Sequence, residues 1–461
     1  MLKWKKLLNE GRRKPKEKKS QVIGTKGSRT EMERDYDRIL FSTPTRRLAD
    51  KTQVFPMDPS DSVRTRLTHS MEVSNLARSV GNTLAFDYAE EIFGKEHENL
   101  NVKRKIPALL AAMGLVHDLG NPPFGHQGEV AMMDWFKKKN SSQNSDIANM
   151  HMDFLKFDGN PQTFRLLTKL QILDDNYGLN LTYGSLAAIV KYPSLWDSTS
   201  KGGYKKFGVF ESERDVIEEV WNETGLSVGV RHPLTHIMEA CDDIAYAVID
   251  AEDTVKKGYA SFYDLMEHLK HFIDDPVVAQ VIKKSEKKNK AYRKDDKLSS
   301  SELNEISMQM FRVYAMYHLI DEVTKFFVDH CTSILNYDIN DGFELIEESK
   351  GANLCKALKS FDYKYAFRNK SVLRLELEGN NYILSTMDML WNAISEPNSA
   401  FAKYACHLVS ENYRRARTRS LQSDEYRDCQ LLCDSMSGMT DNYLVNFHNE
   451  LKPLYDGLSK V

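Results

Sequence analysis

The sequence predicts a mainly α-helical fold that carries one short β-hairpin in its C-terminal portion. Apolar residues recur at three- and four-residue steps through most of the chain, which is typical of helices that bury one face. The 461 residues are 41% hydrophobic and 28% charged, the composition of an ordinary globular protein. One stretch, "SVLRLELEGNNYILS" at 371–385, alternates polar and apolar residues around Gly-Asn-Asn, a pattern typical of a hairpin.

Long helices are predicted where the helical repeat is strongest, at 70–93, 107–119 and 233–258. Pro233 suits the first turn of the third helix, and Gly258 suits its end. The charged run at 283–302 predicts an exposed loop.

Three parts are expected along the chain. Residues 1–30 form a basic arm, and its stretch "RRKPKEKK" has no apolar residue to bury, so the arm is expected to be mobile. Residues 31–330 form a helical body. Residues 331–461 form a helical C-terminal portion with the hairpin near 371–385, and the sequence leaves open whether this portion is a separate domain.

Composition and charge argue against several protein classes. No apolar run approaches the roughly 20 residues that cross a bilayer. The N-terminus lacks an apolar signal core, and the six cysteines are scattered without paired metal spacing, so a cytoplasmic location with reduced thiols is expected. The net charge of −3 argues against attraction of the whole protein to nucleic acid, with the basic arm as a local exception.

The stretch "GLVHDLGNPPFGHQGE" at 114–129 carries candidate metal ligands. His117 and Asp118 close an apolar helix that the following Gly-Asn-Pro ends. Imidazole nitrogen with carboxylate oxygen suits Mn, Fe, Ni or Zn, and a shell of carboxylate and water also accepts Mg. His69, in "RTRLTHSMEV", stands where a polar loop opens a helix and is a third candidate.

A further carboxylate comes from the helix at 233–258. Asp242, Tyr246 and Asp250 stand at i, i+4 and i+8, so one helix face carries all three and could hold a metal and a sugar in sequence. Each piece alone also fits a helix cap, a core residue or a solvated face. Together they form the order H…HD…D, which favours a metal site.

With these motifs the chain resembles the HD-domain superfamily of metal-dependent phosphohydrolases, and more closely its deoxyguanosine triphosphate triphosphohydrolase branch. The motifs that appear in the family's order are "RDYDRILFSTPTRRLADKTQVFP", "RTRLTHSMEV", "VHDLGNPPFGHQGE", "FDGNPQTFR", "KYP", "RHPL", "MEACDDIAY" and "SGMTDNY". They cover nearly the whole chain after the basic arm. "FDGNPQ" departs from the family's more common FEGNAQ, which affects the expected backbone path around Pro161.

The resemblance implies the helical HD-domain fold and assigns roles to individual residues. The implied metal ligands are His69, His117, Asp118 and Asp242. The implied catalytic pair is His126 and Glu129, which "NPPFG" would return toward the cavity by breaking the helix. A histidine can move a proton near neutral pH, and a carboxylate partner fixes its tautomer.

The resemblance also implies a set of substrate contacts: Gln53, Arg66, Asn160, Lys191, Tyr192, Tyr246, Asp250 and Arg312. Tyr246 would pack against the deoxyribose, and Asp250 would accept a hydrogen bond from the 3′-hydroxyl. Arg66 would reach phosphate beside the metal. Arg312 lies on an otherwise apolar helix and either reaches the surface or points into the site. Lys205 and Lys206 are candidates for a further phosphate clamp.

The implied activity is hydrolysis of a deoxynucleoside triphosphate, with dGTP favoured, to the deoxynucleoside and inorganic triphosphate. The implied cofactor is a divalent ion, Mg, Mn or another first-row metal. The implied partners are the dNTP substrate and further copies of the chain, often six. Two alternatives stay open: an HD phosphodiesterase or nucleotidase with another substrate, and a non-catalytic nucleotide-sensing protein.

Overall fold

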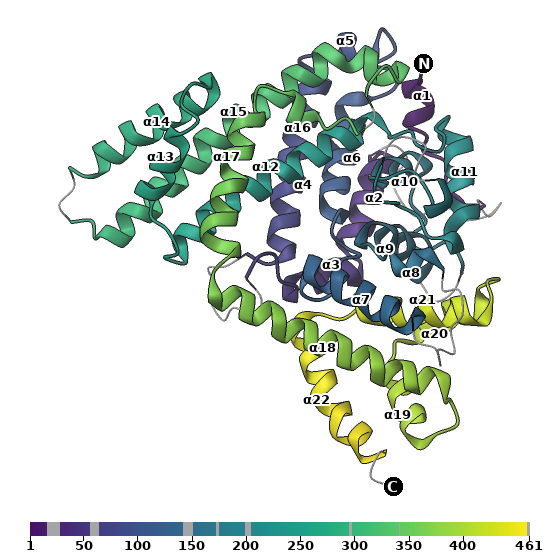
Figure 1. The fold of residues 1–461 in the computed structure, drawn as a ribbon. Helices are drawn as coiled ribbons and strands as arrows, with labels where there is room; N and C mark the ends of the chain where they lie inside the picture. The colour runs from purple at the N-terminus through teal and green to yellow at the C-terminus, as the bar shows by residue number, and fades with distance from the viewer. Residues whose placement is uncertain are drawn as a thin grey trace.

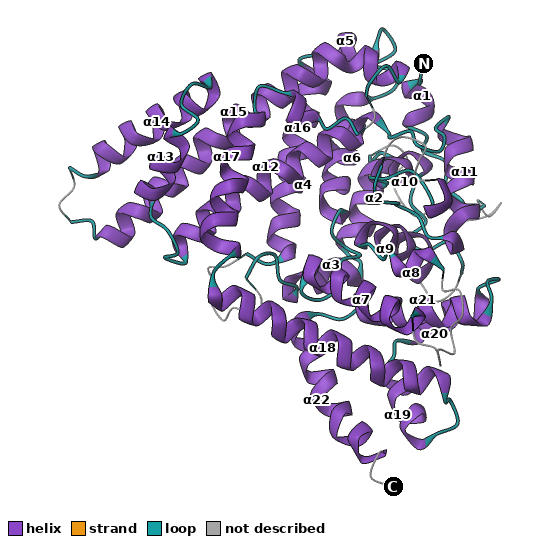
Figure 2. Cartoon of the chain, in the orientation of Figure 1, coloured by secondary structure: helices purple, strands orange, loops and turns teal. Residues whose placement is uncertain are grey.

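The computed structural model describes residues 1–15, 28–55, 64–141, 151–171, 175–198, 204–294, 297–340 and 342–458. Every regular element among these residues is a helix (Figure 2). Two isolated antiparallel bridges, Arg12–Thr182 and Thr52–Thr65, are the extended pairings that the described residues make. The mainly α-helical prediction is therefore confirmed.

The elements of the first half run in this order: α1 (Trp4–Leu7), α2 (Glu31–Leu40), α3 (Thr43–Arg47), η1 (Leu48–Asp50), α4 (Arg66–Phe86), α5 (Ala89–Phe93), α6 (Val102–Val116), α7 (Gly125–Asn140), α8 (Met152–Leu155), α9 (Gly159–Arg165), η2 (Leu166–Leu170), α10 (Tyr183–Ile189), η3 (Trp196–Ser198), η4 (Glu211–Glu213), α11 (Arg214–Thr224) and α12 (Pro233–Lys256).

The second half continues with α13 (Phe262–Lys270), α14 (Pro276–Tyr292), α15 (Ser300–Asn336), α16 (Leu345–Glu348), α17 (Ala352–Asp362), η5 (Tyr363–Phe367), α18 (Lys370–Ser395), α19 (Ala400–Leu408), α20 (Glu411–Arg419), α21 (Asp424–Ser437) and α22 (Asp441–Leu458).

Helices α4, α6 and α12 form the centre of the molecule (Figure 1). Helix α12 is buried along nearly its whole length and also packs against α15 and α17. Pro233 opens α12 at its first position, and Gly258 takes a left-handed φ of 70° just beyond its end, as the sequence predicted. Helices α13, α14 and the adjoining part of α15 project to one side (Figure 1).

The predicted hairpin at 371–385 is wrong, because these residues lie inside helix α18. The glycine of the Gly-Asn-Asn sequence that suggested a turn, Gly379, instead allows close packing of α18 against Phe124. A Cβ on Gly379 would lie 2.7 Å from Cγ of Phe124, so the glycine makes room for that ring against the helix. Val372, Gly379, Ile383 and Met387 are buried at steps of seven and four residues, which is the helical rather than the strand period.

The charged run at 283–302 also differs from the expected loop. Helix α14 continues through Tyr292, because Val278, Val281, Ile282 and Ser285 bury one face while the lysines occupy the other. Asn289 donates to Ser307 Oγ of α15 at 2.8 Å, which ties the end of this helix to its neighbour. Of the described residues in this run, 293–294 and 297–299 lie outside the two helices.

Residues 1–15 of the basic arm pack onto the helical body. Trp4 and Leu7 are buried, and Trp4 Nε1 donates to the carbonyl of Ile92 at 2.8 Å. Arg12 Nη1 lies 2.6 Å from Oδ1 of the fully buried Asp35. The "KEKK" part of the arm lies outside the described residues.

Among the described residues, no helix combines the length and the apolar character needed to cross a bilayer.

Candidate metal centre and active site

The two central histidines are brought together by the crossing of helices α4 and α6. His69 lies in the first turn of α4, and His117 caps the C-terminus of α6. A Cβ on Gly114 would lie 2.7 Å from the backbone of Ser74, so the glycine permits the close approach of the two helices. As a result the two imidazole rings meet edge to face, with centroids 5.4 Å apart.

Asp242 of α12 completes a compact group with these histidines. Its Oδ1 lies 3.1 Å from His69 Nε2 and 3.3 Å from His117 Nε2. One ligand atom from each of the three residues lies within 4.8 Å of the others. His117 Nδ1 lies 2.7 Å from the carbonyl of Gly114, which fixes the proton on Nδ1 and turns the Nε2 lone pair toward the group. Two imidazole nitrogens and a carboxylate fit a divalent first-row metal ion.

The fourth predicted ligand, Asp118, lies beside this group with both oxygens occupied. Its Oδ2 is 3.6 Å from His117 Nε2 and forms an ion pair with Arg66. Its Oδ1 accepts a hydrogen bond from Asn121 Nδ2 at 2.6 Å. Arg66, predicted to contact phosphate, is therefore held beside the metal group by the carboxylate that the sequence assigned to the metal.

Charges within the group reinforce one another. Burial opposes ionisation of Asp242, yet the neighbouring His117 and His69 hold the pKa of its carboxyl well below the usual range. Burial likewise opposes the charged imidazole, but the negative charges of Asp118 and Asp242 raise the pKa of His117 to about 9. The two carboxylates therefore favour positive charge at the centre of the group, carried by a proton on His117 or by a bound cation.

The predicted catalytic pair is in contact, as the loop chemistry suggested. Phe124 takes a left-handed φ of 60° and Gly125 a φ of 57°, so the chain reverses sharply before α7. His126 Nδ1 lies 2.9 Å from Glu129 Oε2, and Glu129 Oε1 accepts the backbone N–H of Gly159 at 2.7 Å. The Glu129 side chain is 9% exposed and that of His126 is 73% exposed. A fixed carboxylate therefore orients an imidazole that is open to substrate.

Glu129→Gln is expected to move the pH profile of kcat/KM toward lower pH. The hydrogen bond that His126 donates to Glu129 is the main cause that raises the pKa of His126, so its loss lowers the pH at which His126 gives up its proton. Values of kcat/KM measured between about pH 5 and pH 9 locate the part of the profile where His126 loses its proton. The charge of Lys206 lowers the pKa of His126, so Lys206→Gln should shift the same part of the pH profile toward higher pH. Identical pH profiles of kcat/KM in the wild type, Glu129→Gln and Lys206→Gln would contradict this assignment.

The sugar-side prediction concerns Gln53, Tyr246 and Asp250. Gln53 Oε1 and Asp250 Oδ2 are buried and have no hydrogen-bond partner among the described residues. Burial, followed by the charge of Asp253, holds the pKa of Asp250 well above the usual range. Tyr246 stacks on Phe367 with ring centroids 6.3 Å apart. Two buried polar atoms without partners are suited to a hydroxyl-bearing ligand, because a ligand can satisfy what the protein leaves unpaired.

The phosphate-side prediction concerns Lys191 and Tyr192. Lys191 Nζ lies 3.4 Å from Glu239 Oε1, and the charge of Glu239 raises the pKa of the lysine despite the opposing effect of burial. Arg231, which the sequence analysis did not single out, pairs with Glu239 at 2.5 Å. Its guanidinium lies over the rings of Tyr192 and Tyr204, 5.5 and 4.6 Å from their centroids. The signal in the sequence was the motif "RHPL", whose arginine received no role.

The remaining predicted contacts divide into two groups. Asn160 lies at the start of α9 and donates to Asp158 Oδ1, while Lys206 lies 2.5 Å from Asp158 Oδ2. Asp158 therefore holds both near the turn that contacts Glu129. Arg312 instead bonds both oxygens of Glu252, at 3.0 and 2.7 Å, which gives it a structural contact on α12. Lys205 is exposed to solvent.

Two further residues hold the loop at 121–124 that precedes His126, and the sequence assigned them no role. Asp441 accepts the backbone N–H groups of Thr52, at 2.9 Å, and of Phe124, at 3.1 Å. Lys51 is 3% exposed and donates to the carbonyls of Asn121 and Ser437, at 2.6 and 2.7 Å. Burial lowers the pKa of Lys51 to about 7. Asp441 belongs to the motif "SGMTDNY", so the C-terminal portion of the chain fixes the loop that leads to His126.

Asp441→Asn is expected to reduce turnover at least several-fold while the protein stays folded. The change removes a charged acceptor from two backbone donors, each such bond being worth about 1.5–3 kcal/mol. It should loosen the segments that carry Gln53 and His126 together, so KM should rise and kcat should fall. Asn442→Ala, at the neighbouring position where the side chain bonds Asp50, is the matched control and should leave both constants nearly unchanged. Equal kinetics in the two variants would contradict the positioning role.

Comparison with known proteins agrees with this geometry. The model of the HD domain matches residues 66–156, which include His69, His117 and Asp118. A deoxyguanosinetriphosphate triphosphohydrolase-like protein of Listeria innocua is 34% identical over 98% of this chain and 100% of its own length. The chain belongs to the deoxyguanosinetriphosphate triphosphohydrolase-like family.

Other members of the triphosphohydrolase-like family match over similar lengths. One from Synechocystis is 30% identical over 98% of this chain and 99% of its own length. A protein from Yersinia pestis named deoxyguanosinetriphosphate triphosphohydrolase is 28% identical over 91% of this chain and 93% of its own length. The chain is thus an HD-domain phosphohydrolase related to dGTPases, with a His–Asp group that can bind a metal.

Proposed function

We propose that this protein hydrolyses a deoxynucleoside triphosphate, with dGTP the preferred substrate, to the deoxynucleoside and inorganic triphosphate. The observation that carries the proposal is that His69, His117 and Asp242 form a group that could hold a metal, while His126 and Glu129, nine and twelve residues beyond His117 in the sequence, contact each other. The family relationship over nearly the whole chain supports the substrate class.

A divalent ion held by His69, His117 and Asp242 would polarise the α-phosphate and help to position the attacking water. Arg66 lies beside this group and can neutralise charge on the phosphate. Water attacks the α-phosphorus, the bond from phosphorus to the 5′-oxygen breaks, and the 5′-oxygen takes a proton. His126, oriented by Glu129, is the group that moves this proton.

The sugar and the outer phosphates would be held by residues on either side of the ion. Gln53 Oε1 and Asp250 Oδ2, which have no hydrogen-bond partner among the described residues, would bind the 3′-hydroxyl, and Tyr246 would pack against the deoxyribose. Lys191 and Tyr192 face the phosphates, with Arg231 fixing the tyrosine ring. We also propose that the protein works as a homo-oligomer, as the resemblance implies.

The proposal is tested by incubating the purified protein with each dNTP and Mg or Mn and identifying the phosphate product. Inorganic triphosphate and deoxynucleoside in equal amounts, formed fastest from dGTP, are expected. Orthophosphate or pyrophosphate as the first product would favour a nucleotidase or phosphodiesterase instead. Binding of dNTP without any product would favour a nucleotide sensor.

A further inference from the structure

A buried carboxyl group lies beside the sugar-side residues of α12 and has no role in the function proposed above. Asp362 is the last residue of α17, which packs against α12 (Figure 1). Its side chain is fully buried, and neither of its carboxyl oxygens has a hydrogen-bond partner among the described residues. A buried polar group that is left unpaired lowers the stability of the fold, so its presence calls for a functional reason.

Asp362 belongs to a cluster of unpartnered polar groups. On α12, Asp250 Oδ2 and, one helical turn further, Thr254 Oγ1 are also buried and have no partner among the described residues. Asp250 carries the charge that acts most strongly on Asp362. The charges of both carboxyls act on Tyr246. Polar side chains from two helices therefore lie close together beside the tyrosine that is assigned to the deoxyribose.

Asp362 is held in its neutral form. Burial, followed by the charges of Asp250 and Asp253, raises the pKa of its carboxyl well above the usual range. Arg64 pairs with Glu252 and Asp253 on α12, and no described basic side chain pairs with Asp362. A protonated carboxyl can donate one hydrogen bond as well as accept, so Asp362 is able to act as a donor to Asp250.

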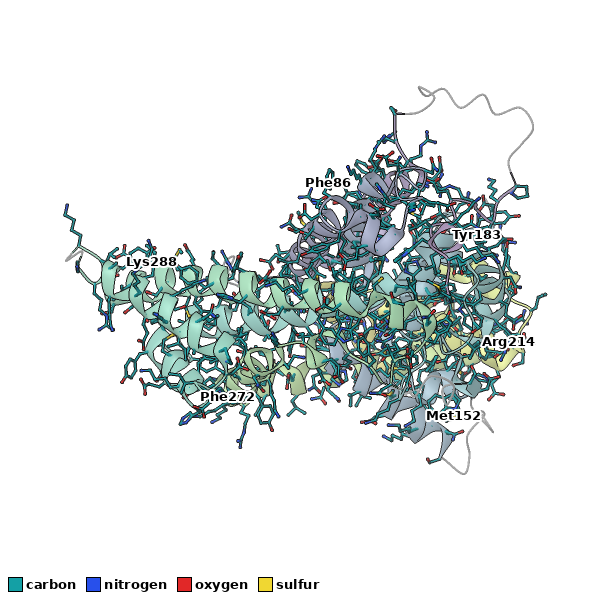
Figure 3. All side chains as sticks on the ribbon, turned by 90° about the horizontal axis from the view of Figure 1, so that it is seen from above. Phe86, Met152, Tyr183, Arg214, Phe272 and Lys288 are labelled. Carbon is teal, nitrogen blue, oxygen red and sulfur yellow. The ribbon has the colours of Figure 1, made fainter. Side chains whose placement is uncertain are left out.

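The segment formed by α17 and η5 is fixed on both sides of the unpartnered carboxyl. Phe361 packs against His268 of α13, with ring centroids 5.7 Å apart. His268 in turn packs against Phe272, which Figure 3 labels in the part of the molecule that projects to one side. At the end of η5, Phe367 stacks on Tyr246. These contacts hold the segment against α12, so the cluster is preorganised.

We propose that Asp362 is a positioning residue of the sugar site: with Thr254 it holds the carboxyl of Asp250 in the orientation that binds the 3′-hydroxyl of the substrate. The inference rests on the proposed function, in which Asp250 Oδ2 receives that hydroxyl. Asp362 is fully buried and acts on the substrate through Asp250. A hydrogen bond donated to one oxygen of Asp250 leaves the other oxygen free to accept from the ligand. The cluster thereby sets the preference for a nucleotide with an intact 3′-hydroxyl.

The test is equilibrium binding of dGTP and of dideoxyGTP, which lacks the 3′-hydroxyl, to the full-length protein with Mn, measured by calorimetry. His126→Ala is the background, so that turnover does not consume the nucleotide. In this background dGTP should bind at least about tenfold more tightly than dideoxyGTP, because a site built to bond a hydroxyl rejects the analogue without it.

Asp362→Ala should reduce this ratio of affinities to about threefold or less, because Asp250 loses its donor. The temperature of thermal unfolding should stay the same or rise, since the change removes an unpaired buried group. Asp362→Asn should keep the ratio, because the amide offers a donor and an acceptor at the same positions. A residue that only fills space would leave the ratio unchanged in both variants.

Thr254→Val and Thr386→Val form a matched pair. Both threonines are fully buried and both hydroxyls lack a partner among the described residues, but Thr386 lies on α18. Thr254→Val should lower the ratio, whereas Thr386→Val should leave it unchanged. A ratio that persists in Asp362→Ala, or that falls as far in Asp362→Asn or Thr386→Val, would overturn the proposal. Absence of dGTP binding in the background protein would contradict the proposed function and this inference with it.

Discussion

Asp242→Ala is expected to lose bound metal and turnover together, whereas Asp243→Ala keeps both. Asp242 Oδ1 is the atom that both His69 and His117 approach, so its removal takes away the one carboxylate oxygen that the two imidazoles share. The adjacent Asp243 points elsewhere and lies 2.5 Å from Lys359 Nζ. The two carboxylates stand about 100° apart around one helix, which makes the neighbouring residue a close control.

Metal analysis of the purified variants, with activity measured alongside, checks this expectation. His117→Ala should behave like Asp242→Ala, because it removes a nitrogen ligand from the same group. A metal content that falls in Asp243→Ala and persists in Asp242→Ala would reverse the assignment of the helix face. The outcome for Asp118→Ala is informative as well, since that carboxylate also holds Arg66.

His126→Ala is expected to keep metal and substrate binding but to lose turnover by about 100-fold or more, the usual scale of general acid–base assistance. The side chain is open to solvent and is bonded by Glu129, so its loss removes a proton carrier without disturbing buried packing. Rapid-mixing rates and equilibrium binding of dGTP separate the two effects. His151, which is also exposed and bonded to a carboxylate, provides a control position.

His151→Ala should leave turnover nearly unchanged, because this imidazole caps α8. Turnover that stays at the wild-type level in His126→Ala would make the second histidine of the loop a structural residue. Loss of metal in the same variant would instead show that the two halves of the loop are not separable.

The helical fold could be predicted from the sequence because it depends on local patterns, whereas the metal ligands His69, His117, Asp118 and Asp242 were implied by the resemblance, and the structure brings three of them together. The apolar repeat predicted that α12 is a helix, and Pro233 and Gly258 predicted where it begins and ends. The hairpin prediction failed because Gly379 is explained by a contact with Phe124, more than two hundred residues away. A pattern of alternating residues carries no information about such a contact.

Positioning residues were missed for the same physical reason. Lys51 and Asp441 act on backbone groups of the loop at 121–124, and backbone partners leave no signature in the sequence. Arg231 acts on tyrosine rings from another segment. The placement of Arg312 on an apolar helix left two outcomes open, and its hydrogen bonds to Glu252 could not be predicted from that pattern.

The most direct test of the central claim is hydrolysis of dGTP in water enriched in ¹⁸O, with both products examined by mass spectrometry. Attack of water at the α-phosphorus places the heavy oxygen in inorganic triphosphate and leaves deoxyguanosine unlabelled. Equal amounts of the two products are expected, with one labelled oxygen in the triphosphate. Label in the deoxyguanosine, or labelled orthophosphate as the first product, would contradict it.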